Sequence, residues 1–209
     1  MKKVEIIYGG ESNEKEISHL TAKSIYEHID TDLYNPGLTD LSKFDPDNFD
    51  NETIFFIAVH GEGGEDGKIQ TLLENKKRKF TGSSSESCIL TWDKVATKRT
   101  LISNNILTPK FKSIKNNEYF DFNDSFFAEN EHYFVKPNFN GSSYGISKVS
   151  DKKFNEAIKE AKNYSTEVII EKSFNGPEYT VALLKGKPLT PLQILHDPIR
   201  GFYDYDAKY

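Results

Sequence analysis

A lysine followed by a Gly/Ser-rich loop is the segment of this chain best suited to bind phosphate. Residues 136–147 read Lys-Pro-Asn-Phe-Asn-Gly-Ser-Ser-Tyr-Gly-Ile-Ser. Glycine lets backbone N–H groups approach an anion closely, serine hydroxyls add donors, and lysine supplies a positive charge. The run matches neither the Walker A pattern nor the dinucleotide-binding G-x-G-x-x-G pattern, and a Gly/Ser run alone is more often an ordinary β-turn. Its interpretation therefore depends on the elements that flank it.

Composition and charge limit what the chain can be. Its 209 residues suffice for a substantial core and for one or two domains. The net charge of -5, without a dense stripe of lysine and arginine, argues against nucleic acid or an anionic membrane as the main partner. The longest apolar run, residues 54–59, is too short to span a bilayer, and Met1-Lys2-Lys3 leads into a strand rather than a signal-peptide core. We therefore expect a cytoplasmic protein, whose single Cys88 is a packing residue and not a nucleophile.

Two strand–helix units are predicted in the first part of the chain. The strand 4–8 ends at Gly9-Gly10, and a helix follows, with Asn13 and Glu16 at the spacing of a capping box. The second unit is the continuous apolar strand 54–59, a Gly-rich loop and another helix, a pattern typical of a parallel sheet. The region before about Asp93 is thus predicted to be a doubly wound α/β domain. The apolar helix positions are Ile17, Leu20, Ile25 and Ile29 in the first unit and Ile69, Leu72 and Leu73 in the second.

The second part of the chain alternates strands and helices differently. A single helical pattern from Ile89 to Asn105 is broken by Thr108-Pro109, where we expect a domain boundary. A strand at 133–136 precedes the Gly/Ser loop. The elements predicted after the loop are a helix with Phe154, Ala157, Ile158 and Ala161, a strand at 168–171, and a hairpin of 179–184 with 188–195 around Lys185-Gly186-Lys187.

Six segments, in one order along the chain, resemble the D-alanine–D-alanine ligases of the ATP-grasp superfamily. They are residues 9–18 (GGESNEKEIS), His60-Gly61 with 64–67, 92–94, 134–147, Glu171 with 176–181, and 202–209 (FYDYDAKY). The resemblance implies a Rossmann-like (pre-ATP-grasp) N-terminal α/β domain at 1–93 that binds substrate. An ATP-grasp α+β domain would follow, with its central lid domain at 94–177 and an incomplete, C-terminally truncated part at 178–209. A homodimer through the N-terminal domain is also implied.

The activity implied by the resemblance is the ATP-dependent joining of two D-alanines into the dipeptide of the peptidoglycan stem. The carboxylate of the first D-alanine is phosphorylated, and the amine of the second displaces phosphate. A carboxylate and a γ-phosphate are both anionic, so cations and hydrogen-bond donors must surround the transferring group. The implied cofactors are ATP and Mg²⁺ (or Mn²⁺).

The resemblance also implies roles for individual residues. The phosphates would be contacted by Lys94, Lys136, Lys208, Ser142 and Ser143. The adenine would lie against Glu171, Lys172 and Phe174, and the ribose against Glu178. The first D-alanine would be held by Glu14, His60 and Glu65, with Glu14, Ser142 and Tyr209 hydrogen-bonded together across the closed catalytic site.

Ordinary structural roles remain open for several of these residues. Glu14 could instead pair with a helix dipole, His60 could be a satisfied loop histidine, and Glu178 could be solvated. Lys136 is the least suited to a purely surface role, because strand alternation places it on the same face as Phe134.

The chain departs from the family at its C-terminal end. Family members continue into an Arg-x-Asp segment and a Glu-Ile-Asn-Thr-x-Pro-Gly segment that bind Mg²⁺, and neither occurs here, so no metal ligand is assigned. We expect that the sequence stops short of the natural protein or that the gene product is truncated. We also expect the 209-residue chain alone to have no measurable ligase activity. Its 179–195 hairpin should expose apolar surface. A non-catalytic nucleotide- or amino-acid-binding remnant and a D-alanine–D-lactate ligase stay open as alternatives. Tyr209 favours D-alanine, because the family has phenylalanine there for D-lactate.

Overall fold

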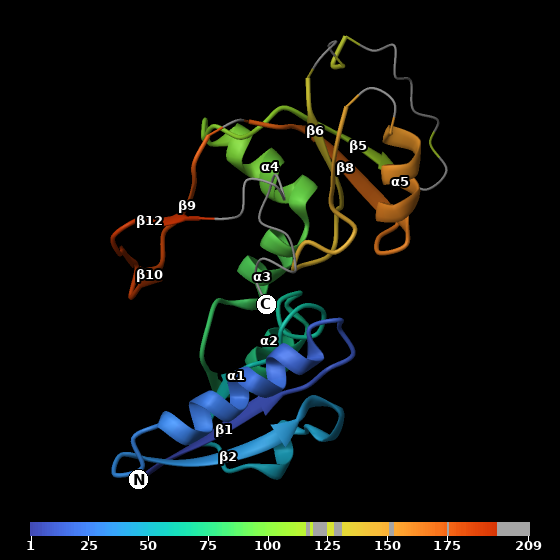
Figure 1. Ribbon diagram of the computed structural model, residues 1–209. Helices are drawn as coiled ribbons and strands as arrows, with labels where there is room; N and C mark the ends of the chain where they lie inside the picture. Colours follow the sequence, from blue (N-terminus) through green and yellow to red (C-terminus); the bar gives the residue numbers. More distant parts are fainter. Residues whose placement is uncertain (116–117, 119–124, 128–130, 151–152, 175, 196–209) are drawn as a thin grey trace. The chain divides into compact units, whose positions relative to one another are not determined.

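The computed structural model describes residues 1–115, 118, 125–127, 131–150, 153–174 and 176–195 (Figure 1). The chain divides into two compact units, Met1–Ile106 and Leu107–Tyr209. The helices are α1 (Lys15–His28), α2 (Lys68–Asn75), α3 (Ser85–Trp92), α4 (Lys94–Ser103) and α5 (Phe154–Lys162), with short 3-10 helices η1 (Leu41–Lys43) and η2 (Pro46–Asn48). The strands are β1 (Lys2–Tyr8), β2 (Tyr34–Asp40), β3 (Ile54–Ile57), β4 (Lys79–Phe80), β5 (Phe111–Lys115), β6 (Tyr133–Pro137), β7 (Ser147–Val149), β8 (Glu167–Lys172), β9 (Glu178–Thr180), β10 (Leu183–Leu184), β11 (Lys187–Pro188) and β12 (Leu192–Ile194). Within the described ranges, no helix is long and apolar enough to cross a membrane.

The first unit is built on a four-stranded parallel sheet in the order β2-β1-β3-β4. The two predicted strands are confirmed as β1 and β3, which pair at the centre of the sheet. The sequence pattern does not predict β2, because that strand contains Pro36-Gly37, a pair typical of turns. β2 lies at the edge of the sheet, where a missing N–H is tolerated, and Pro36 pairs in register with Val4.

The two faces of this sheet pack against different helices. Val4 and Ile6 of β1 share a buried cluster with Ala22 of α1. The opposite face contributes Ile7 and Phe55 to a second buried cluster, together with Val59 and with Ile69 and Leu73 of α2. Successive side chains of a strand point to opposite faces, so β1 is covered on both.

The inner face of α1 is confirmed in part, since the predicted Ile25 and Ile29 pack against the buried cluster of Val4, Ile6, Ala22 and Ala58. Its fully buried residues are Ser18 and Ala22, and Leu20 is 63% exposed. Small side chains lie where the helix backbone approaches the sheet most closely, so hydrophobicity alone misses Ser18 and Ala22 and wrongly includes Leu20. The predicted capping box is also wrong, since the helix begins at Lys15 and its N-cap residue, Glu14, makes no side-chain capping hydrogen bond.

The single helix predicted from Ile89 onward is two helices, α3 and α4, that meet at Asp93. This residue has extended backbone angles (φ -84°, ψ 100°) and ends α3. Its carboxylate accepts a hydrogen bond from the Ala96 N–H at 2.8 Å and so caps α4. Aspartate is a strong N-cap, which explains why a continuous apolar pattern is interrupted here.

The second unit contains an antiparallel sheet in the order β5-β8-β6-β7. One face packs on α5 (Figure 1). The predicted residues of this helix, Phe154, Ala157, Ile158 and Ala161, are all buried. The strands contribute Tyr133, Val135, Val168 and Ile170 to the same core. Their neighbours Phe134, Lys136 and Glu171 alternate to the other face.

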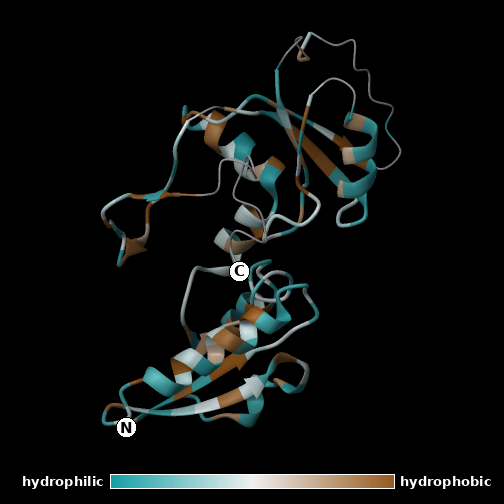
Figure 2. Cartoon of the chain, viewed as in Figure 1, coloured by the Kyte–Doolittle hydropathy of each residue, from teal (hydrophilic) through white to brown (hydrophobic). Residues whose placement is uncertain are grey.

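The predicted hairpin is confirmed in outline. β9 pairs with β12, and β10 pairs with β11 through a turn in which Lys185 and Gly186 have φ of 52° and 74°. Two consecutive positive φ values match the twist of a two-residue hairpin. As expected, apolar side chains here are exposed, notably around β10 (Figure 2). They are Tyr179, Val181, Leu183, Leu184, Leu189, Leu192 and Leu195.

Candidate functional site

Glu14 lies at the start of α1, next to the loop that follows β3. Only 5% of its surface is exposed. A Cβ atom built on Gly61 would lie 3.1 Å from the Glu14 carboxylate, so the carboxylate is in contact with the Gly61 backbone. Gly61 has φ of +71°, a conformation that favours glycine. Glu14 and Gly61, 47 positions apart in sequence, are thus brought together at the carboxyl end of β1 and β3.

His60 lies beside this carboxylate, with a partner on each ring nitrogen. Its Nε2 is 2.9 Å from the Thr21 hydroxyl of α1, and its Nδ1 is 3.8 Å from the Glu65 carboxylate. Glu65, and to a lesser degree Glu14, raises the pKa of His60 against the opposing effect of burial. The same His60 contact lowers the pKa of Glu65, assisted by the Gly61 N–H and by the charge of Lys94. The two carboxylates therefore stabilise the protonated form of His60 relative to a free imidazole.

Two serines hold the loops of this cluster, and sequence reasoning missed both as site residues. The Ser12 hydroxyl donates to the His60 carbonyl at 2.7 Å and accepts from the Glu14 N–H at 3.2 Å. The fully buried Ser18 accepts from the Gly9 N–H and donates to the Ala58 carbonyl, each at 2.8 Å. These hydroxyls join α1 to the ends of β1 and β3. For Ser18 the signal in the sequence is a polar residue on the inner face of the amphipathic helix α1, whereas Ser12 precedes the helix and no periodic pattern marks it.

Lys94 is half-buried at the first position of α4, in the same unit as Glu65. After the larger effects of His60 and Gly61, its charge makes a small further contribution to lowering the pKa of Glu65. Of the residues implied for the first unit, Glu14, His60 and Glu65 thus form one cluster, and Lys94 interacts electrostatically with it.

In the second unit, Lys136 and Glu171 form an ion pair on the sheet face opposite α5. They come from the neighbouring strands β6 and β8, and both are largely shielded, with side chains 19% and 10% exposed. The Lys136 ammonium also lies 5.9 Å from the centre of the Phe134 ring, which confirms that these two residues share a face. A third strand adds Lys148, whose ammonium is 5.8 Å from the same ring. The sequence analysis did not identify Lys148. Its position directly opposite Phe134, on the strand that follows the Gly/Ser loop, is what places it on this face.

The Gly/Ser loop between β6 and β7 has an unusual backbone. Ser142 and Ser143 have φ of 48° and 65°, and Gly145 has φ of 68°. A side chain at Gly145 would come within 2.6 Å of the Tyr164 ring, so this position requires glycine. Positive φ is uncommon for non-glycine residues, and strained segments of this kind cluster at ligand sites.

The remaining implied residues are placed less centrally. Lys172 follows Glu171 on β8, and its ammonium pairs with Glu131 at 2.5 Å, which raises the pKa of the lysine. Phe174 is 73% exposed, and Glu178 is exposed at the start of β9. Lys208 and Tyr209 lie outside the described residues. The convergence of Glu14, Ser142 and Tyr209, which come from two units and an undescribed segment, stays a prediction.

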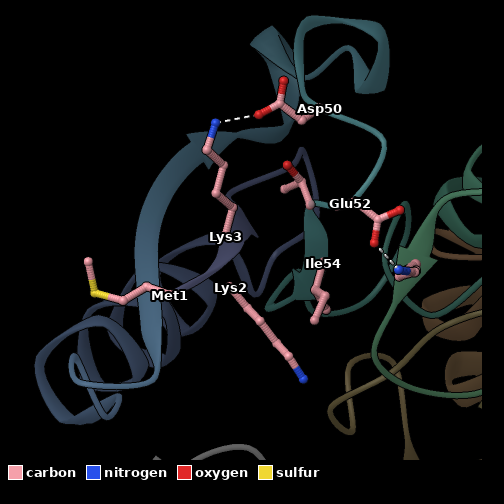
Figure 3. A pocket seen from close by; sticks show the side chains of 8 residues that line it. Met1, Lys2, Lys3, Asp50, Glu52 and Ile54 are labelled. Atoms are coloured by element: carbon pink, nitrogen blue, oxygen red, sulfur yellow. Dashed lines mark hydrogen bonds and ion pairs between the residues drawn. The ribbon is translucent and has the colours of Figure 1, made fainter.

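Two hollows lie at opposite edges of the parallel sheet of the first unit. One, of about 460 Å³, is at the amino ends of β1, β3 and β4, where Lys3 pairs with Asp50 and Lys79 with Glu52 (Figure 3). The other, of about 380 Å³, is at the carboxyl ends and is lined by Gly10, Glu11, Lys15, Asp40, Leu41, Ser42, Glu62, Gly63 and Lys68. Ligands of open α/β sheets bind at carboxyl ends, which is also where the Glu14–His60–Glu65 cluster lies.

Comparison with known proteins gives a consistent family. A family model described as the C-terminus of D-Ala–D-Ala ligase matches residues 102–209. The D-alanine–D-alanine ligase of Marinomonas sp. (strain MWYL1) is 34% identical over 219 residues, which cover 99% of this chain and 67% of the relative. The D-alanine–D-alanine ligase of Methylacidiphilum infernorum (isolate V4) is 35% identical over 209 residues, which cover 99% of this chain and 65% of the relative. The chain spans about two thirds of the length of these curated relatives.

Solved structures agree with the sequence relatives. The D-alanine–D-alanine ligase of Bacillus anthracis complexed with ATP has a TM-score of 0.83 at 28% identity, covering 94% of this chain and 67% of that one. A second structure of the ligase from Bacillus anthracis has a TM-score of 0.84 at 30% identity, and the match covers 100% of this chain and 69% of that one. The mixed α/β fold is therefore shared with these ligases. From the family model and the identities together, the chain belongs to the D-alanine–D-alanine ligase family.

Proposed function

We propose that the protein to which this chain belongs joins two D-alanines at the expense of ATP. The observation that carries this is the buried Glu14 carboxylate close to the His60–Glu65 pair at the carboxyl end of the parallel sheet. A small zwitterion needs an anion for its ammonium group and a cation for its carboxylate. In this cluster Glu14 would be the anion and protonated His60 the cation. The names of the relatives support D-alanine as that zwitterion.

In this proposal the first unit binds the first D-alanine. Glu14 accepts hydrogen bonds from its ammonium, and the His60 imidazolium attracts its carboxylate. Glu65 and Thr21 hold the imidazole from its two nitrogens, so the ring has one orientation. An ammonium bound in this way fixes the position of the carboxylate that must attack.

The second unit then binds ATP, in agreement with the ATP complex of the relative from Bacillus anthracis. Lys136, Ser142 and Ser143 contact the phosphates. The roles proposed for the other residues are phosphate contacts from Lys94 and Lys208, adenine contacts from Glu171, Lys172 and Phe174, a ribose contact from Glu178, and a Glu14–Ser142–Tyr209 hydrogen-bond network.

The chemistry proceeds in two displacements. A carboxylate oxygen of the first D-alanine attacks the γ-phosphorus, the bond to the β-phosphate oxygen breaks, and ADP leaves. The amine of the second D-alanine attacks the acyl carbon, loses a proton and expels inorganic phosphate. Lys136 contributes by offsetting negative charge where it accumulates on the transferring phosphoryl group.

Mg²⁺ is typical of the family, but the described residues do not suit it. Within the described ranges, no group of three or more His, Cys, Asp or Glu side chains lies close enough to hold a metal ion. We therefore assign no step of the proposal to a metal bound by this part of the protein.

Three features of organisation belong to the same proposal. The first feature is the division into domains: a Rossmann-like domain at 1–93, a central ATP-grasp domain at 94–177 and a further ATP-grasp part from 178. The parallel sheet with helices on both faces supports the first of these domains. The second is a homodimer through the N-terminal domain. The third is a cytoplasmic location, where ATP is available.

Calorimetric titration of the 209-residue chain tests the ligand assignments. We expect ATP and D-alanine to bind, and D-lactate, which lacks the ammonium group, to bind at least tenfold more weakly than D-alanine. Glu14→Gln should lower D-alanine affinity by at least tenfold and leave ATP affinity unchanged. The matched control is Glu16→Gln, an exposed glutamate in the same helical turn. Equal effects of the two substitutions, or tight D-lactate binding, would contradict the proposal.

A further inference from the structure

The sheet face of the second unit that is not covered by α5 carries a row of side chains from three strands. Phe134 on β6 is in register with Lys148 on β7 and with Glu171 on β8. Lys136 lies two residues along β6 from Phe134 and therefore on the same face. Two lysines, one carboxylate and one aromatic ring are thus neighbours on this face.

The charges in this row are unequal. Glu171 forms an ion pair with Lys136, and this pair neutralises the negative charge of the carboxylate. Within the described residues Lys148 forms no ion pair; its contact is with the Phe134 ring, 5.8 Å from the ammonium. The same ring lies 5.9 Å from the Lys136 ammonium. Two cations thus share one aromatic ring, and of these two only Lys136 has a carboxylate partner among the described residues.

We propose that Lys148 is a further phosphate-binding residue of this chain, acting beside Lys136 on the nucleotide. The inference rests on the proposed function. Two ammonium groups on one ring repel each other, and an anion that contacts both removes that repulsion. A polyphosphate is the anion that fits, because Lys148 comes directly after the strained Gly/Ser loop and projects from the face where Lys136 lies.

The position of Lys148 also explains why a lysine is suited to it. A lysine on β7 has a long flexible stem that lies along Phe134 and carries a mobile positive charge. It can move from the ring to a phosphate oxygen with little change in the backbone. Lys136 must in addition leave Glu171, so the two lysines would respond to nucleotide differently.

Binding of a series of nucleotides tests this role. ATP, ADP, AMP and adenosine are titrated calorimetrically into the unmodified chain and into Lys148→Gln. We expect ATP affinity to fall about tenfold, the loss to shrink as phosphates are removed, and adenosine binding to be unchanged. Lys148→Arg should retain most of the ATP affinity, because it keeps the charge. The matched control is Lys159→Gln, which removes an exposed lysine of α5 from the same unit.

A second readout separates a charge contact from a packing role. The ATP affinity of the unmodified chain should fall with added salt, and the slope should be smaller in Lys148→Gln. Circular dichroism checks that the variant is folded. An equal loss for ATP and adenosine, or no loss for ATP in a chain that otherwise binds it, would overturn the inference and leave the proposed function standing. Failure of the unmodified chain to bind ATP would instead overturn the nucleotide part of the proposed function, and this inference with it.

Discussion

The two units place their candidate residues by different means. In the first unit, Glu14, His60 and Glu65 lie on loops at the ends of parallel strands, and hydroxyl groups of α1 and its N-terminal loop bond to the backbone of those loops. In the second unit, Lys136 and Glu171 project from the two central strands of an antiparallel sheet, and Lys148 projects from its edge strand β7. The first arrangement fixes backbone positions closely. The second fixes strands and leaves long charged side chains able to change partners.

This difference predicts where each unit is sensitive to substitution. The first should respond most to changes in small residues that bring backbones together. The second should respond most to changes in charge. The following predictions test that contrast, from the largest expected effect to the smallest.

Gly64→Ala should destabilise the first unit by about 3 kcal/mol. A Cβ atom at Gly64 would lie 2.2 Å from the carbonyl oxygen of Val59, so the loop after β3 must move. The control is Gly82→Ala, where φ is +108° but no atom lies within 4 Å. We expect about 1 to 2 kcal/mol there, from backbone strain alone. Urea unfolding measures both values, and equal destabilisation would show that the loop is not tightly packed.

Lys136→Ala should weaken ATP binding by about 100-fold and leave D-alanine affinity unchanged. It also removes the ion pair with the largely buried Glu171 carboxylate, which should cost about 1 to 2 kcal/mol of unfolding free energy after allowing for partial exposure. Adding Glu171→Gln should restore stability and not ATP affinity. Calorimetry and thermal unfolding separate the two effects. A loss of D-alanine affinity with normal ATP binding would show that the lysine is wrongly assigned.

Ser18→Ala should destabilise the first unit by about 2 kcal/mol. The substitution leaves the Gly9 N–H without its acceptor and the Ala58 carbonyl without its donor, both in buried surroundings. Ser24→Ala, on the exposed side of the same helix, should change stability by less than about 0.5 kcal/mol. Chemical unfolding of the two variants gives the comparison. A small effect at Ser18 would mean that these two hydrogen bonds do not hold α1 to the sheet.

The His60–Glu65 pair should give a small pH dependence of stability. The pKa of His60 is raised in the folded state, so its contribution is fully present below the unfolded value of about 6.5 and is lost as pH rises through the folded value. The pKa of Glu65 is lowered, so its contribution is present above about 4.5 and is lost as pH falls through the folded value. The pair therefore contributes most between about pH 4.5 and 6.5.

Because both side chains are about one third to one half exposed, this contribution should be less than about 1 kcal/mol. The unfolding free energy of the unmodified chain minus that of Glu65→Gln, measured across pH 4 to 9, should be largest in that window. A difference that keeps growing above pH 8 would be inconsistent with a protonated His60.

Much of the architecture follows from local sequence patterns. Continuous apolar runs predicted β1 and β3, and the 3.6-residue period predicted α5 with all four of its buried residues. Alternation placed Lys136 and Phe134 on one face. These predictions succeeded because the period of a helix or a strand is a property of a few consecutive residues.

Long-range pairing was decided only by the tertiary structure. β2 is a strand because β1 offers it a partner, although Pro36-Gly37 reads as a turn. Ser18 and Ala22, rather than Leu20, face the sheet because the helix lies close to it. The contacts of His60 with Thr21, and of Lys136 with Glu171, join residues 39 and 35 positions apart. No periodic signal records such pairs, because they depend on strand register and helix docking, which the whole fold determines.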